Sequence, residues 1–282
     1  MVENRPWANL VSHLILIVGV LIVAFPVYVA FVASTTDMAT IANGQLSLVP
    51  DRHLVENYAQ ILFHGTQSAT KQPMIVPLMN SLIMALGIAI GKIFISLLSA
   101  FAIIYFRFPF RRTAFWVIFL TLMLPVEVRI YPTYKIVSDL HMLDSYAGLI
   151  IPLIASATAT LLFRQFFMTV PDELVEASKI DGAGALRFFK DTLLPLSITP
   201  IAAMFVIQFI YGWNQYLWPL LITTRDNMQT IVIGIQKILL VADSLTEWQL
   251  AMATTILAML PPVVIVVAMQ RLFVRGLVET EK

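Results

Sequence analysis

Residues 171–195 read PDELVEASKIDGAGALRFFKDTLLP, and this stretch decides the fold. It is a long polar interval between two strongly apolar stretches, and it carries helix signals of its own. Pro171 suits the first position of a helix. The carboxylates of Asp172 and Glu173 fall in the first turn, where the helix dipole favours negative charge. The sequence therefore predicts a helix outside the apolar spans.

Glycines predict where this helix ends. Gly182 and Gly184 are expected to stop it, because glycine readily takes the left-handed conformation that a C-cap needs. A second amphipathic run, 186–194, follows, and Pro195 is expected to open the next apolar span. The segment 168–195 is thus predicted to be a helix–turn–helix that is too charged to enter lipid.

One face of the first helix carries small apolar side chains. Leu174, Ala177 and Ile180 recur at helical spacing, and charged residues flank them. Small apolar groups inside a charged surround suit a groove on another protein. We therefore expect this loop to dock onto a partner, although an ordinary solvated loop with a glycine turn is the alternative.

The composition indicates an integral membrane protein. Of 282 residues, 59% are hydrophobic and only 12% are charged, and the mean hydropathy is +0.84. A soluble domain carries roughly 25% charged residues. The net charge of +1 gives no sign of a nucleic-acid partner, and the absence of cysteine excludes disulfides and thiolate metal sites.

Apolar stretches long enough to cross a bilayer recur along the chain. We expect an all-α polytopic protein in which residues 1–282 form a single transmembrane domain. The six expected spans are approximately 10–33, 73–105, 113–138, 145–166, 196–222 and 248–270, with Pro125 bending the third.

The placement of basic residues predicts the orientation. With both termini in the cytosol, eleven Lys and Arg residues lie on the inner side and six on the outer side. Such a bias is typical of the cytosolic face. The loop 168–195 is therefore expected in the cytosol of a bacterial inner membrane, where ATP is available.

The polar loop resembles the EAA loop of bacterial ABC importer permeases. Glu176-Ala177-Ser178, Gly182 and Leu194-Pro195 match its pattern, whereas Ser178 replaces an alanine and Thr192 stands where isoleucine is usual. The resemblance implies that this loop couples to an ATPase. The implied coupling residues are Glu176, Ala177, Ser178, Asp181, Gly182, Leu194 and Pro195.

Further stretches widen this resemblance to the carbohydrate-type ABC importers. It implies a type I importer permease fold, a homologous permease partner, two ATPase subunits that hold ATP and magnesium, a periplasmic binding protein and a surrounding lipid bilayer. The chain itself is expected to bind no cofactor or metal and to catalyse no reaction. Within the family, the permeases of sn-glycerol 3-phosphate importers are similar in residues 4–7, 123–129, 142–149 and 211–220. A permease for a neutral sugar or oligosaccharide is the alternative.

Polar residues inside the apolar spans are candidates for the substrate pathway, since polar groups in a membrane usually face protein or water. Arg129 could hold a phosphate through its planar donor set, or form a structural contact. Gln208, Tyr211 and Gln215 share a helical face, which either lines the pathway or bonds to neighbouring helices. Lys92 is expected to snorkel to the cytosolic surface. The full candidate set is Asn80, Glu127, Arg129, Gln208, Tyr211, Trp213, Asn214 and Gln215.

Two other classes of membrane protein fit the sequence less well. An ion-coupled carrier predicts inverted repeats, and the sequence shows none. A membrane enzyme predicts clustered acid–base residues, whereas the four histidines are scattered.

Overall fold

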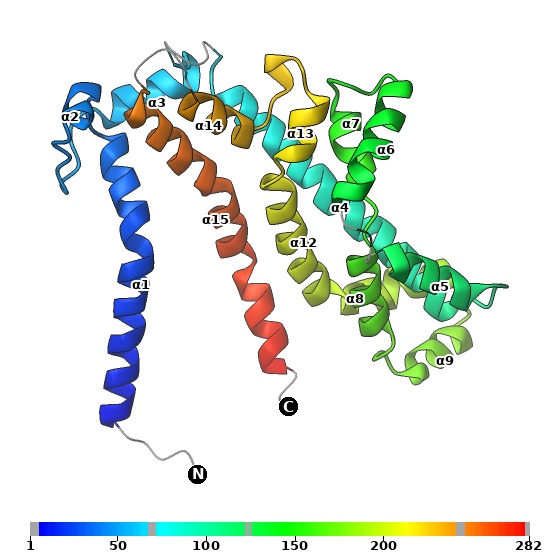
Figure 1. Ribbon diagram of the computed structural model, residues 1–282. Helices are drawn as coiled ribbons and strands as arrows, with labels where there is room; N and C mark the ends of the chain where they lie inside the picture. The colour runs from blue at the N-terminus through cyan, green and yellow to red at the C-terminus, as the bar shows by residue number, and fades with distance from the viewer. Residues whose placement is uncertain (1–5, 67–71, 122–123, 125, 241–245, 280–282) are drawn as a thin grey trace. The chain divides into compact units, whose positions relative to one another are not determined.

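Helices make up most of the chain in the part that the structure describes. The computed structural model describes residues 6–66, 72–121, 124, 126–240 and 246–279, and every regular element within these ranges is a helix (Figure 1). The all-α prediction is confirmed. The chain divides into two compact units: unit 1 comprises Met1–Ile75 and Gly234–Leu260, and unit 2 comprises Val76–Ile233 and Pro261–Lys282.

The elements follow one another through connections of different lengths. In chain order they are α1 (Pro6–Ser34), α2 (Met38–Ala42), α3 (Leu54–Phe63), α4 (Ile75–Tyr105), α5 (Arg111–Leu120), α6 (Val126–Asp139), α7 (Tyr146–Ile150), η2 (Ile151–Leu153), α8 (Ala157–Phe167), α9 (Asp172–Ile180), α10 (Ala185–Phe188), η3 (Phe189–Leu193), α11 (Leu194–Leu196), α12 (Ile198–Trp213), α13 (Leu217–Ile222), η4 (Asp226–Met228), α14 (Ile231–Leu239) and α15 (Trp248–Glu279).

Within the described residues, three helices are long and apolar enough to cross a membrane. They are Asn9–Ser34 within α1, the whole of α4, and Trp248–Leu272 within α15. They correspond to the first, second and sixth expected spans. The third expected span contains α5 and α6; residues 122, 123 and 125, and with them the expected bend at Pro125, lie outside the described residues.

The fourth and fifth expected spans are broken helices. In the fourth, Tyr146–Leu153 and Ala157–Phe167 meet at 48°. The break has a local cause, because the Ser156 hydroxyl accepts a hydrogen bond from the Ala159 amide at 3.2 Å and so caps α8 anew. The fifth is divided further along, because α12 ends at Trp213 and α13 begins at Leu217. At its start, the segment Ala185–Leu196, most of which was expected in the polar loop, meets Ile198–Trp213 at 74°.

Unit 1 is held by polar contacts at the end of α1. The Asn57 side chain on α3 donates to the carbonyls of Ser34 and Thr36, both at 2.9 Å. The Thr35 hydroxyl accepts from the Asp51 amide at 2.9 Å. Most apolar side chains along α1 are exposed in this chain, which suits contact with lipid or a second subunit.

Two apolar clusters form the interior of unit 2. One joins α4, α8, η3 and α12 around Phe101, Phe163 and Leu193. The other joins α4, α6, α7 and α13 around Met84, Leu149 and Trp218. Helix α4 contributes to both clusters, so it connects the two parts of this interior.

Small residues let helices approach α4 closely. A methyl group added to Gly212 on α12 would lie 2.9 Å from Ala85 Cα on α4. Methyl groups added to Gly87 and Gly91 would each lie 2.6 Å from an isoleucine side chain. The contact at Gly212 is with backbone, which cannot rotate away, so this is the tightest constraint of the three.

We expect Gly212→Ala to destabilise the permease by about 1–3 kcal/mol, because overpacking a filled interface displaces backbone. Gly19→Ala is the matched control, since a methyl group there meets nothing within 4 Å. The measurement is the thermal unfolding midpoint of each purified variant in detergent. Equal midpoints for the two variants would contradict this account of the contact.

Candidate functional site

Helix α9 ends in a left-handed glycine turn, as the sequence predicts. Gly182 has φ +72°. Its amide donates to the Lys179 carbonyl at 3.0 Å, and the Ala183 amide donates to the Ser178 carbonyl at 2.9 Å. These two bonds make a Schellman motif, which satisfies the last carbonyls of the helix. Asp181 is the C-cap residue.

Helix α9 and the residues after it differ in two details from the expectation. Pro171 is the N-cap residue, and the helix begins one residue later at Asp172. Gly184 has φ −72° and caps the start of α10 instead of ending α9. Gly182 alone therefore supplies the left-handed conformation, because the Schellman motif needs only one such residue.

Helix α9 leaves an apolar face uncovered by this chain. Val175 packs against the cluster of α4 and α8. Leu174 is 37% exposed and Ile180 is 86% exposed, and Glu176 and Ala177 are exposed with them. The predicted docking face is thus free, while the opposite face fixes the helix to unit 2.

The second half of the loop packs inward. Phe188 and Leu193 are buried in the same cluster, and Leu194 packs against it. Residues 189–193 form a turn of π-helix, and Pro195 lies in the short α11. The predicted amphipathic run is therefore an anchor, whereas α9 is the part that projects. Within unit 2, α9 lies at the end opposite to α13 (Figure 1).

Asn80 is engaged within the chain. Its side-chain amide donates to the carbonyls of Asn227 and Gln229 at 2.8 and 2.9 Å. Its oxygen accepts from the Tyr146 hydroxyl at 2.7 Å. These three bonds favour a structural role, in which Asn80 ties α7 and the segment before α14 to α4.

Lys92 corrects one sequence interpretation. We expected it to snorkel to the membrane surface, but it is only 6% exposed. Its Nζ donates to Gln208 Oε1 at 3.0 Å and lies 3.6 Å from the centre of the Tyr211 ring. Gln208 and Tyr211 therefore share a face, as predicted from their spacing. A buried lysine needs a hydrogen-bond acceptor or an aromatic ring beside it. The polar face of Gln208 and Tyr211 could have indicated such partners in the sequence.

The remaining candidates in the fifth expected span occupy different surroundings. Trp213 is buried and stacks on Phe209 with the ring centroids 5.9 Å apart. Asn214 is the exposed C-cap residue of α12. The Gln215 side chain lies beyond the helix and donates to the Tyr211 carbonyl at 3.2 Å.

The two ionisable candidates lie on α6. Arg129 is exposed. It lies within electrostatic range of Lys92 and Tyr211. The side chain of Glu127 is outside what the structure describes. The structure thus brings Gln208 and Tyr211 together with Lys92, and Arg129 on α6 acts on this group through its charge. It places Asn80, Trp213 and Asn214 elsewhere.

Sequence reasoning missed a polar anchor at Asp144. Its carboxylate accepts from the amides of Thr224 and Arg225 at 2.6 and 2.9 Å and from the Thr224 hydroxyl at 2.6 Å. Desolvation alone would raise the pKa of Asp144, but these hydrogen bonds and the Arg225 charge lower it below its usual value. The anchor fixes the turn before α7 to the end of α13.

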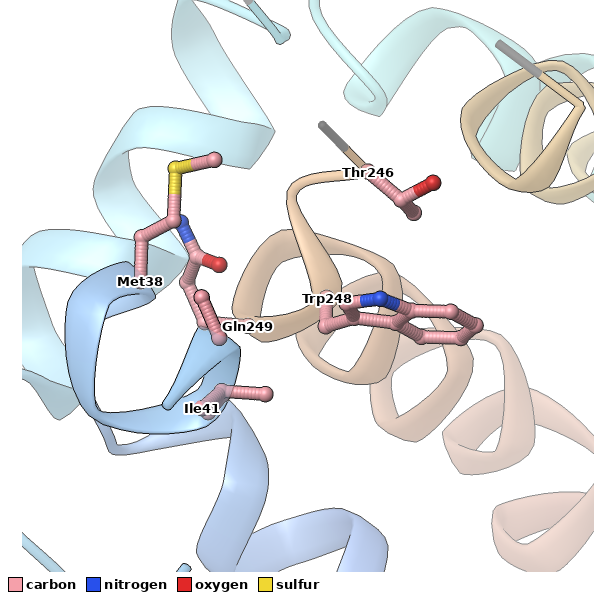
Figure 2. A pocket seen from close by; sticks show the side chains of 6 residues that line it. Met38, Ile41, Thr246, Trp248 and Gln249 are labelled. Carbon is pink, nitrogen blue, oxygen red and sulfur yellow. The ribbon is translucent and has the colours of Figure 1, made fainter. Parts of the chain in front are cut away.

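The cavity beside α2 does not contain the predicted residues. It measures about 320 Å³ and is lined by Met38, Ile41, Ala42, Thr246, Trp248 and Gln249 (Figure 2). All six residues belong to unit 1. The residues that the sequence predicts for the substrate pathway all lie in unit 2.

Comparisons with known proteins identify the class. Residues 92–279 match the family described as binding-protein-dependent transport system inner membrane component. The chain belongs to this family, and it is thus a permease subunit of an ABC importer in the inner membrane. A bacterial ABC transporter involved in the import of the acidic polysaccharide alginate has the same fold, with a TM-score of 0.80 at 17% identity over 96% of this chain and 98% of that chain.

Similar curated proteins have names that specify the transported compound. The chain is 58% identical over its full 282 residues to the sn-glycerol-3-phosphate transport system permease protein UgpE of Brucella melitensis. It is 57% identical to the protein of that name from Rhizobium meliloti and 56% identical to the one from Escherichia coli O157:H7. All three alignments cover 100% of both chains.

The Asp144 anchor should make stability depend on pH. Because the pKa of this carboxyl is lowered, its contribution is fully present above the ordinary aspartate pKa of about 3.9 and is lost as the pH falls through the lowered value. We expect Asp144→Asn to unfold at a lower temperature near pH 7 and to lose less stability on acidification than the wild type.

The matched control is Asp139→Asn, since Asp139 makes only an exposed ion pair with Lys135 at 3.2 Å. Thermal unfolding in detergent over about pH 2 to pH 7 checks the expectation. Parallel curves for the wild type and Asp144→Asn would contradict it.

Proposed function

We propose that this chain forms half of the translocation pathway of an ATP-driven importer of sn-glycerol 3-phosphate, with glycerophosphodiesters as further substrates. The choice of substrate is supported by the 58% identity over all 282 residues to a permease named for sn-glycerol 3-phosphate transport. Residues 1–282 act as one transmembrane domain, with both termini and α9 on the cytosolic side, as the eleven-to-six distribution of basic residues favours.

The assembly that we propose contains three further kinds of subunit. A homologous permease completes the pathway, two ATPase subunits bind ATP and magnesium, and a periplasmic protein delivers the substrate. This chain performs no catalysis. Closure of the ATPase dimer moves α9, and the pathway opens alternately to the periplasm and the cytosol.

The exposed face of α9 supports this coupling role. Leu174, Ala177 and Ile180 are apolar, and exposed apolar residues on an amphipathic helix suit a groove on a partner. Gly182 sets the direction in which the chain leaves this helix. We propose that Glu176, Ser178 and Asp181 flank the contact, and that Leu194 and Pro195 hold its base.

The test of substrate uses the complete assembly reconstituted in proteoliposomes. Uptake and ATPase stimulation are measured with the binding protein loaded with sn-glycerol 3-phosphate, a glycerophosphodiester or a neutral sugar. Import of the phosphorylated ligand supports the proposal. Import of the neutral sugar alone would replace it with the alternative.

Replacing Gly182 should uncouple ATP hydrolysis from uptake. A left-handed backbone costs a residue with a Cβ about 1 kcal/mol or more, so Gly182→Leu is expected to displace α9 while the complex still reaches the membrane. Gly182→Asn should retain more activity, since asparagine tolerates this conformation.

Gly184→Leu is the matched control, because Gly184 has an ordinary φ and, like Gly182, open space around it. The ratio of substrate imported to ATP hydrolysed is the measurement. A wild-type ratio in Gly182→Leu would contradict the proposed role of this turn in coupling.

Single cysteines can test the orientation, since the chain has no native cysteine. We expect Glu56→Cys on α3 to react with an impermeant maleimide in intact spheroplasts. Arg112→Cys at the start of α5 should react only after permeabilisation. Both side chains are exposed, so access depends on the side of the membrane. The reverse pattern would overturn the topology.

A further inference from the structure

Lys92 carries a positive charge deep inside unit 2. It lies 13 residues before the end of α4 (105 minus 92), which is about 20 Å along the helix. Its partners, the Gln208 amide and the Tyr211 ring, are both neutral. Among the described side chains, the ion pairs do not include Lys92. Its charge is therefore hydrogen-bonded, but no opposite charge among the described side chains balances it.

A second cation lies on a helix that packs against α4. Arg129 on α6 precedes Ile130, which packs against the cluster that contains Ile88, about one turn from Lys92 on α4. Its charge acts on both Lys92 and Tyr211. No described carboxylate forms an ion pair with Arg129 either. Two like charges near one another raise the energy of the folded state, most of all where one of them is buried as Lys92 is. An arrangement of this kind is expected where an anion joins the two cations during function.

The N–H donors of Lys92 and Arg129 that have no partner within the described residues suit a phosphate group. An ammonium group has three N–H donors, and Gln208 accepts from one of them, which leaves two for a ligand. A guanidinium presents a planar fork that can bind two oxygens together. A phosphate monoester carries a charge of about −1.5 to −2 at pH 7 and three acceptor oxygens. Its charge thus matches two cations, which a neutral sugar would leave uncompensated.

We propose that Lys92, held in place by Gln208 and Tyr211, forms with Arg129 a site that binds the phosphate of the transported phosphate monoester. This inference rests on the proposed function, since it presumes a phosphorylated substrate. Lys92 supplies the fixed charge from α4, and Arg129 supplies the more exposed charge from α6. The site gives this permease a direct part in selecting its substrate within the membrane.

A structural role for Lys92 makes a different prediction about paired substitutions. If the Lys92–Gln208 bond only joins α4 to α12, replacing both residues by apolar ones of similar size restores packing without leaving a buried polar group unpaired. If Lys92 binds phosphate, the same pair of changes removes the ligand's partner. The variant Lys92→Met/Gln208→Leu therefore separates the two roles.

The experiment measures sn-glycerol 3-phosphate uptake by the complete assembly in proteoliposomes, at matched levels of assembled complex. We expect Lys92→Met, Lys92→Met/Gln208→Leu and Arg129→Ala each to lower uptake by about 10- to 100-fold, the effect of losing one hydrogen bond to a charged group. Lys92→Arg should lower it less, because the charge remains. Stimulation of the ATPase by the loaded binding protein should persist in all four.

The matched control is Lys135→Gln, which removes a positive charge from the exposed surface of α6. It should import at the wild-type rate. Wild-type uptake by Lys92→Met, or recovery of uptake in the Lys92→Met/Gln208→Leu pair, would overturn the phosphate site. Failure of the wild-type assembly to import sn-glycerol 3-phosphate would instead overturn the proposed function, so the two failures are distinguishable.

Discussion

Helices α4 and α12 meet backbone to backbone at Ala85 and Gly212, and the polar interior of unit 2 depends on this contact. Lys92 lies two helical turns along α4 from Ala85, and Gln208 lies about one turn along α12 from Gly212. Both therefore project from the faces that meet. A wider separation of the helices would leave the lysine without its partners, and a charge in lipid costs several kcal/mol.

Polar side chains otherwise serve mainly to close connections around α4. Asn80 binds two carbonyls before α14, and the Ser81 hydroxyl accepts from the Ile231 amide at 2.8 Å. The Asp144 carboxylate accepts from two backbone amides in the segment after α13. Backbone groups near a bilayer need internal partners. Side chains from the helices supply these partners where regular structure is interrupted.

Local signals in the sequence predicted local structure well. The left-handed turn at Gly182 follows from residues within a few positions of it, and the polar segment that contains α9 stands out between apolar spans. The helix breaks were harder to predict, because a cap such as Ser156 is short and lies within an apolar stretch. Contacts between distant residues could not be predicted. Asp144 and Thr224 are 80 positions apart, and spacing cannot reveal which helix faces Lys92.

The angle between α12 and the segment before it has a mechanical consequence. Residues 185–196 run at 74° to α12, and Phe188 and Leu193 clamp them into the cluster with α4. A force applied through α9 therefore reaches α12 from the side and not along its axis. It acts as a torque on the start of the helix near Ser197. Because Gly212 holds the far end of α12 against Ala85 of α4, such a torque would turn α4 together with α12.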